Sequence, residues 1–191
     1  IKMLVCALRE HVTNKIISYK TENPQTVFQT VFDFDETQFS DYDIIIDEKS
    51  NKYPAYECVE IFSAYVKLCT SENSPLCGKK LTLAELRNEA FISVGENNGL
   101  TKILANACRK RGFSPNFVVQ SNDLSCTKKC VESGIGIGIV RIDGNEQFAT
   151  NLSYLDVVDF NEMQTLCLYY KKSAAYGNVK HFLEFFIDRK L

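Results

Sequence analysis

The sequence has no long apolar run. Its longest uninterrupted apolar stretch, residues 3–8, is far shorter than the roughly 20 residues of a membrane-spanning helix. The N-terminal residues also lack the pattern of a secretory leader. We therefore expect a protein that is neither exported nor associated with a membrane.

A dominant charge of one sign is missing as well. The 22 Lys and Arg residues nearly balance the 24 Asp and Glu residues, for a formal net charge of −2. Basic residues occur only in short clusters, the longest being Arg109-Lys110-Arg111. A nucleic-acid surface usually needs a continuous basic stripe to displace counterions. We therefore do not expect this chain to bind DNA by itself.

Histidine is scarce, which limits the metal sites that can be built. The chain has two histidines, His11 and His181. Cys126 and Cys130 lie four residues apart on a predicted helix and share one of its faces. No second Cys or His pair at zinc-binding spacing accompanies them. We expect neither a metal nor a cofactor.

The signatures of common enzyme classes are absent too. The sequence has no Gly-x-Ser-x-Gly elbow, no His-Glu-x-x-His motif and no P-loop. The segment Gly134–Gly138 follows a predicted helix and precedes a predicted strand, the reverse of a dinucleotide-binding fingerprint. Close packing of helix on strand explains its glycines better. We expect no catalytic residue, although a Cys–His enzyme stays an alternative because the sequence places no cysteine relative to His11 or His181.

The chain is rich in cysteine and in apolar residues. Its 191 residues are 45% apolar, enough for one or two domains with their own cores. Several of the eight cysteines, such as Cys6 and Cys167, lie inside apolar runs, where a reduced thiol acts as a small apolar side chain. Because such a chain does not depend on disulfides, we expect a reducing, cytoplasmic location. The first residue is not Met, so we expect a fragment of a longer protein.

Apolar periodicity predicts strands that alternate with helices. Residues 57–69 are β-branched and aromatic over an unusual length, and form either two strands or one strand that passes between two sheets. The helix at 82–87 begins with a capping box of Thr82 and Glu85. This alternation is typical of an α/β chain with mostly parallel sheets. The other predicted strands are 3–8, 27–34, 42–47, 91–94, 117–120, 135–140, 154–160 and 163–170, and the other helices 11–21, 100–111, 124–133 and 178–188.

Two loops occupy the position where open α/β sheets bind ligands, after a strand and before a helix. Helix N-termini there offer unpaired N–H groups to anions. Arg9 and two such helix ends suit a small anionic or zwitterionic metabolite held by charge-assisted hydrogen bonds. The predicted ligand-binding residues are Leu8, Arg9, Glu10 and His11 in the first loop, Gly95, Glu96 and Asn97 in the second, and Ser121 and Asn122 ahead of a helix cap at Asp123.

The order of the motifs resembles the effector-binding domain of LysR-type transcriptional regulators. The likeness covers nearly the whole chain. It is carried by Tyr65–Cys69 followed by Ser74-Pro75-Leu76 and Leu81–Leu86, by the helix-to-strand stretch Asp123–Val140 with Val131-Glu132-Ser133-Gly134-Ile135-Gly136-Ile137, by the strand Tyr42–Ile46, and by the aromatic closing helix Phe182–Ile187.

The resemblance implies a two-lobed fold like that of type 2 periplasmic binding proteins. Two mostly parallel sheets would be joined by two crossover strands, 57–69 and 163–170. Lobe I would comprise residues 1–65 and 166–191, and lobe II residues 66–165. A small-molecule effector would bind between the lobes, on the loops named above.

The resemblance also implies partners. A winged helix-turn-helix domain, not present in this chain, would precede the domain and bind DNA, and the regulator would form a homodimer or a higher homo-oligomer. A solute-binding protein of a transport system, which shares the fold, is the alternative. The sequence departs from the family where the first strand ends, because Ala7-Leu8-Arg9 stands where a Ser or Thr is common.

Overall fold

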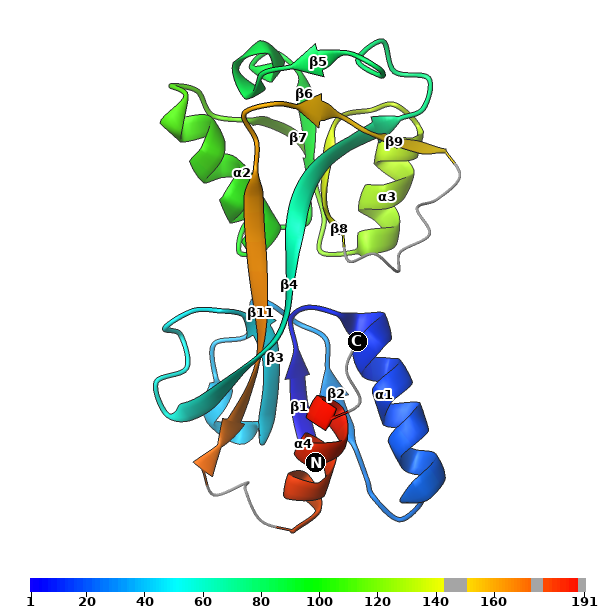
Figure 1. Cartoon of the computed structure of the whole chain (residues 1–191), viewed down its shortest axis with the longest axis vertical. Helices are drawn as coiled ribbons and strands as arrows, with labels where there is room; N and C mark the ends of the chain where they lie inside the picture. Colours follow the sequence, from blue (N-terminus) through cyan, green and yellow to red (C-terminus); the bar gives the residue numbers. More distant parts are fainter. Residues whose placement is uncertain (143–150, 173–176, 189–191) are drawn as a thin grey trace. The chain divides into compact units, whose positions relative to one another are not determined.

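A computed structural model describes residues 1–142, 151–172 and 177–188 (Figure 1). Its contacts divide the chain into two compact units. Unit 1 comprises Ile1–Ser63 and Thr165–Leu191, and unit 2 comprises Ala64–Gln164. The chain passes between the units through two long strands, β4 (Tyr56–Ser71) and β11 (Glu162–Lys171), which are neighbours in one sheet.

The sheet of unit 1 is built around β1 (Lys2–Val5). This strand lies between β2 (Gln29–Val31) and β3 (Ile44–Glu48) and is parallel to both, while β11 pairs antiparallel with β3. Strands that are covered on both faces have continuous apolar sequences, which explains the apolar residues Met3–Val5 of β1 and Ile44–Ile46 of β3. The other elements of unit 1 are α1 (Arg9–Glu22), the 3₁₀ turn η1 (Phe39–Asp41) and α4 (Gly177–Asp188).

The core of unit 1 contains a cluster of aromatic residues. Phe182 of α4 is completely buried and meets Tyr19 of α1 and Phe28 edge to face, with ring centroids 5.1 and 4.9 Å apart. This arrangement satisfies the quadrupoles of the rings while it buries their area. Apolar residues of β1, β3 and β11 complete the cluster, so that α1 and α4 pack against each other and against the sheet.

Unit 2 has three sets of paired strands. Antiparallel pairs join β4 to β8 (Gly138–Ile142) and to β9 (Leu152–Tyr154). Parallel pairs join β6 (Ala90–Ser93) to β7 (Asn116–Gln120) and β5 (Lys80–Leu81) to β10 (Asp156–Val157). The remaining elements are the 3₁₀ turn η2 (Leu83–Leu86) and the helices α2 (Gly99–Lys110) and α3 (Leu124–Glu132).

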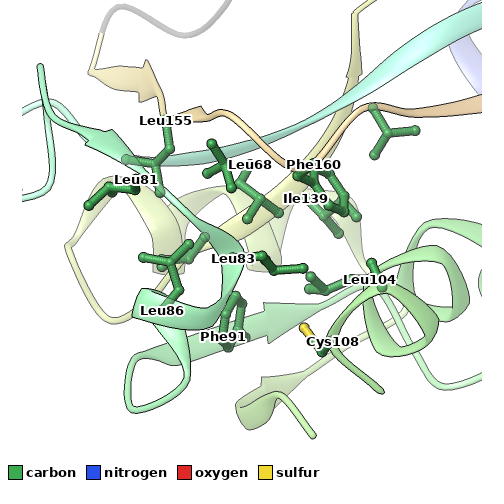
Figure 2. Close-up of a cluster of buried hydrophobic side chains, with 14 of the residues drawn as sticks. Leu68, Leu81, Leu83, Leu86, Phe91, Leu104, Cys108, Ile139, Leu155 and Phe160 are labelled. Carbon is green, nitrogen blue, oxygen red and sulfur yellow. The ribbon is translucent and has the colours of Figure 1, made fainter. Parts of the chain in front are cut away.

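The core of unit 2 is largely aliphatic. Figure 2 shows side chains of η2, α2 and the strands converging around Leu83, which is fully buried. The predicted capping box is confirmed, because the Thr82 amide donates to Glu85 Oε2 at 2.6 Å. Members of this core include Leu68, Leu81, Leu86, Phe91, Leu104, Cys108, Ile139, Leu155 and Phe160.

The structure corrects several predicted element bounds. The first strand ends at Val5 rather than Leu8, since Leu8 adopts a left-handed backbone conformation and α1 begins at Arg9. The strand predicted at 27–34 is reduced to three residues. The strand predicted at 154–160 is divided between β9 and β10, which pair with different partners. No helix among the described residues is long and apolar enough to cross a membrane.

The glycine-rich segment packs closely, as the sequence predicts. Gly134 adopts φ +73° just after α3 and ends that helix. A Cβ atom on Gly136 would lie 2.8 Å from the carbonyl oxygen of Ala90, and one on Gly138 would lie 2.8 Å from a methyl group of Val131 in α3. The glycines therefore allow β8 and the residues before it to approach β6 and α3.

Replacing Gly136 with alanine is expected to lower the free energy of unfolding by about 1–3 kcal/mol, the usual cost of overpacking. The clash is with backbone, which has little room to move because Ile137 N donates to Ala90 O at 2.8 Å. Urea denaturation measures the loss, with Ser114→Ala, an exposed position before β7, as control. Equal stability of the two variants would contradict the close approach.

Candidate functional site

The carboxyl ends of β1, β2 and β3 meet at one edge of the unit 1 sheet, where α1 begins. Leu8 lies at this point with φ 56° and ψ 39°, and it is the one non-glycine residue with positive φ in the described parts of the chain. This conformation costs a side-chain-bearing residue about 1–2 kcal/mol. Such strain is typical of backbone that is held in place around a ligand.

The N-terminus of α1 is not capped by a side chain. The first hydrogen bond of the helix runs from Val12 N to Leu8 O at 2.9 Å, so the amides of Arg9 and Glu10 precede the ladder. Glu10 is exposed and forms no capping hydrogen bond. This helix end therefore offers N–H groups and a positive partial charge to an anion.

Arg9 adds a full positive charge at the same edge. Its guanidinium lies 5.8 Å from the centroid of the Phe32 ring and donates a long hydrogen bond, 3.4 Å, to the Phe32 carbonyl oxygen. A guanidinium has five N–H donors in a planar fork that matches a carboxylate or phosphate. The contact with Phe32 holds the side chain beside the start of α1 and leaves donors for a ligand.

A buried polar group behind this edge was missed by the sequence analysis. The carboxylate of Asp47, at 7% exposure, accepts hydrogen bonds from the Tyr53 hydroxyl at 2.6 Å and from Glu48 N at 2.8 Å, and lies 3.5 Å from Lys52 Nζ. Burial, with repulsion from Asp47, raises the pKa of Tyr53 well above its ordinary value. The one signal in the sequence was an acidic residue directly after the apolar run 44–46.

Cys6 lies at the same edge but is not an activated nucleophile. Its thiol is buried and donates to the Asp33 carbonyl oxygen at 3.1 Å. Burial, and then the negative charge of Asp47, raise the pKa of Cys6 far above the ordinary value of a thiol. A thiol nucleophile needs the opposite shift. This cysteine is therefore a poor partner for catalysis with His11, whose ring meets Phe186 edge to face at 5.8 Å.

Unit 2 has a corresponding edge at the carboxyl ends of β6 and β7. Ser121 N donates to Ser93 O at 3.1 Å, which joins the segments that follow the two strands. Gly95, with φ +99°, turns the chain after β6 towards α2. Glu96, Asn97 and Asn122 are exposed beside them. The structure thus brings all five predicted residues of this unit to one edge.

The helix ends of unit 2 differ from that of α1 because side chains cap them. Asn98 Oδ1 accepts from Leu100 N at 2.9 Å at the start of α2. Asp123 Oδ1 accepts from Ser125 N at 2.7 Å at the start of α3, and Ser121 Oγ accepts from Asp123 N at 3.1 Å. A carboxylate already occupies the anion position of α3. Among the N-termini of α1, α2 and α3, that of α1 is therefore the one that no side chain caps within the described residues.

Two hydroxyl groups of unit 2 are buried and have no hydrogen-bond partner among the described residues. They are Ser93 Oγ, at the end of β6, and Thr101 Oγ1, in the first turn of α2, with residue exposures of 0% and 4%. Buried hydroxyls nearly always have a partner, so each of these retains hydrogen-bonding capacity. The sequence analysis missed both, although a serine ending a buried strand was a visible signal.

Two of the predicted ligand-binding residues, Leu8 and His11, have side chains that pack inside unit 1, so only their backbone atoms can belong to the candidate site. Leu8 is 9% exposed and belongs to the core of unit 1, and the ring of His11 packs on Phe186. Among the residues that the structure describes, no group of three or more His, Cys, Asp or Glu side chains is placed to hold a metal ion. The two edges are built for hydrogen bonding and charge complementarity.

Comparison with protein families gives one match across most of the chain. The model of the LysR substrate binding domain matches residues 9–190. A comparison with curated proteins finds no match.

Solved structures share the fold. The regulatory domain of CcmR from Synechocystis PCC6803, in complex with 2-PG, superposes with a TM-score of 0.84 at 13% identity over 99% of this chain and 95% of its own. The cofactor-binding domain of the Cbl transcriptional regulator superposes with a TM-score of 0.82 at 21% identity over 100% and 89%. The effector-binding domain of QuiR, in complex with shikimate, does so with a TM-score of 0.77 at 13% identity over 100% and 96%.

Proposed function

Because this chain belongs to the family of LysR substrate binding domains, we propose that it binds a small polar or anionic metabolite and thereby controls a transcriptional regulator. The family match over residues 9–190 is the observation that carries the proposal. Metabolite binding becomes regulation when the ligand favours one conformational state of the protein over another.

The start of α1 is the proposed anion-binding set. Its uncapped amides and the Arg9 guanidinium lie at one edge of unit 1, and both favour negative charge. Acidic side chains are close by: Asp33 Oδ1 accepts from Asp35 N at 2.8 Å in a local turn. A ligand of modest charge, such as a monocarboxylate or a zwitterion, suits this mixture better than a polyanion.

The edge of unit 2 supplies neutral hydrogen-bonding groups. We assign this role to Ser93, Thr101 and Ser121, together with the exposed Asn97 and Asn122. Asp123 lies at the same edge and repels a second anionic group. The edge of unit 2 therefore favours the uncharged polar groups of a metabolite, whereas the start of α1 in unit 1 favours an anionic group.

The ligands named for two related structures, 2-PG and shikimate, support a small polar effector for this chain. The family match favours a regulatory domain over a solute-binding protein of a transport system. It also supports two further proposals: a DNA-binding domain elsewhere in the same polypeptide, and a cytoplasmic homodimer. The coding sequence upstream of Ile1 and light scattering of the isolated domain test these two.

A panel of hydroxylated carboxylates, amino acids and phosphate esters tests the function. At least one compound is expected to raise the melting temperature and to bind in calorimetry at a ratio of one per chain. Binding to the native state at 100 times the Kd stabilises it by about 2.7 kcal/mol. Uncharged analogues of the binding compound serve as controls. A panel in which no anionic or zwitterionic compound binds more tightly than its uncharged analogue would contradict the proposal.

A further inference from the structure

We propose that Cys58 and Cys167 form an oxidisable thiol pair in unit 1, which a hydroperoxide converts into an intramolecular disulfide. Cys58 lies on β4 and Cys167 on β11, which are neighbours in the sheet. The two side chains are in hydrogen-bond contact with each other. Both residues belong to the same unit, so the pair does not depend on the placement of unit 2.

The pair is reachable from solvent through one of its members. Cys58 is exposed and lines a pocket of about 370 Å³ with Lys49, Ser50 and Asn51, whereas Cys167 is completely buried behind it. A peroxide can therefore reach the sulfur of Cys58, and the sulfur of Cys167 meets it from the interior. An exposed thiol beside a resolving thiol is the usual arrangement of an oxidation-sensitive site.

Accessibility favours Cys58 as the attacking group, since it is exposed while Cys167 is buried. The Lys49 ammonium beside the same pocket forms an ion pair with Glu60, and this contact raises the pKa of Lys49. Burial, together with the hydrogen bond that its thiol donates to Cys58, raises the pKa of Cys167 to about 12, so that Cys167 stays protonated until its partner has reacted.

The reaction balances in two steps. The Cys58 thiolate attacks the peroxide, the O–O bond breaks, and the products are a sulfenic acid on Cys58 and an alcohol, or water when the oxidant is hydrogen peroxide. The Cys167 sulfur then attacks the sulfenic sulfur, the S–O bond breaks and water leaves. Overall the two thiols lose two electrons and two protons to the peroxide. The new bond joins the two strands through which the chain passes between its units.

Hydrogen peroxide and peptide mapping test the proposal on the intact domain. Trypsin places each relevant cysteine in a peptide of its own: Cys58 in 53–67, Cys167 in 142–171, Cys126 in 112–128 and Cys130 in 130–141. Oxidation is expected to lower the intact mass by two hydrogen atoms and to link peptides 53–67 and 142–171. Dithiothreitol should reverse both changes.

Two serine variants identify the mechanism. Cys58→Ser, at an exposed position, should abolish the link, and Cys167→Ser should trap the sulfenic acid, with about tenfold more dimedone adduct on Cys58 than in the unaltered protein. The pair on α3 provides the control, since Cys126→Ser/Cys130→Ser should leave the link unchanged. Absence of the 53–67 to 142–171 link in the oxidised protein, or an equal yield of dimedone adduct on Cys58 in Cys167→Ser and in the unaltered protein, would overturn the proposal.

Discussion

Replacing Phe182 with alanine is expected to lower the free energy of unfolding by about 3–5 kcal/mol, the range for truncating a buried aromatic residue. The ring has 0% exposure and makes edge contacts with Tyr19, Phe28 and Phe186, the last with centroids 5.8 Å apart. Its removal leaves a cavity between α1, α4 and the sheet, which rigid secondary structure cannot close. Urea denaturation, followed by tyrosine fluorescence or circular dichroism, measures the loss.

His181→Ala is the matched control for this variant. It alters the neighbouring position of α4, which is exposed, and it tests the helix without disturbing the core. Its effect is expected to stay within about 0.5 kcal/mol, as for most surface substitutions. If Phe182→Ala lowers the free energy of unfolding by less than about 1 kcal/mol, and the slope of that free energy against urea concentration is unchanged, the aromatic cluster does not stabilise the unit.

Replacing Arg9 with alanine is expected to weaken binding of the anionic effector found in the panel by about tenfold to a hundredfold. This range corresponds to about 1.5–3 kcal/mol for a hydrogen bond to a charged group, at 1.4 kcal/mol for each factor of ten. Arg9→Lys keeps the charge but not the planar fork, so it should recover part of the affinity. Isothermal titration calorimetry measures the three dissociation constants.

Arg109→Ala controls for the loss of one positive charge. Arg109 is exposed in α2 of unit 2, where its guanidinium donates to Asn106 Oδ1 at 2.9 Å. Its removal changes the net charge by the same amount as Arg9→Ala but leaves the start of α1 intact. If Arg9→Ala and Arg109→Ala bind the effector with equal affinity, Arg9 does not contact the ligand. The amides at the start of α1 would then bind the anion without it.

Local patterns predicted much of this fold. The helix predicted at 178–188 is α4, and Phe182, Leu183 and Phe186 of its aromatic segment are buried. The overlong apolar segment 57–69 is a single strand, β4, that extends from unit 1 into unit 2. The interpretation of Gly134 as a helix end and of the following glycines as close-packing positions is confirmed. In each case the signal lies within a few residues of the feature.

Predictions were poorer where partners are distant. The segment 154–160 reads as one strand, but hydrogen bonds from Leu155 N to Leu68 O and from Val158 N to Leu81 O assign its halves to different neighbours. The left-handed conformation of Leu8 was also not predicted, because positive φ is expected from Gly, Asn or Asp and not from an apolar side chain. The site was also predicted incompletely, since the burial of Thr101 Oγ1 without a described partner becomes apparent only in the structure.

The sequence by itself determined the α/β class, the approximate positions of helices α1 to α4, the capping box at Thr82 and the membership of the family, because periodicity and capping are local properties of the chain. Only the tertiary structure decided that α1 has the open helix end while Asn98 and Asp123 close the other two, and that Cys58 meets Cys167. Those facts depend on the contacts of particular side chains, in the last case between residues more than a hundred positions apart. Such contacts follow from the balance of packing over a whole unit, which no short segment encodes.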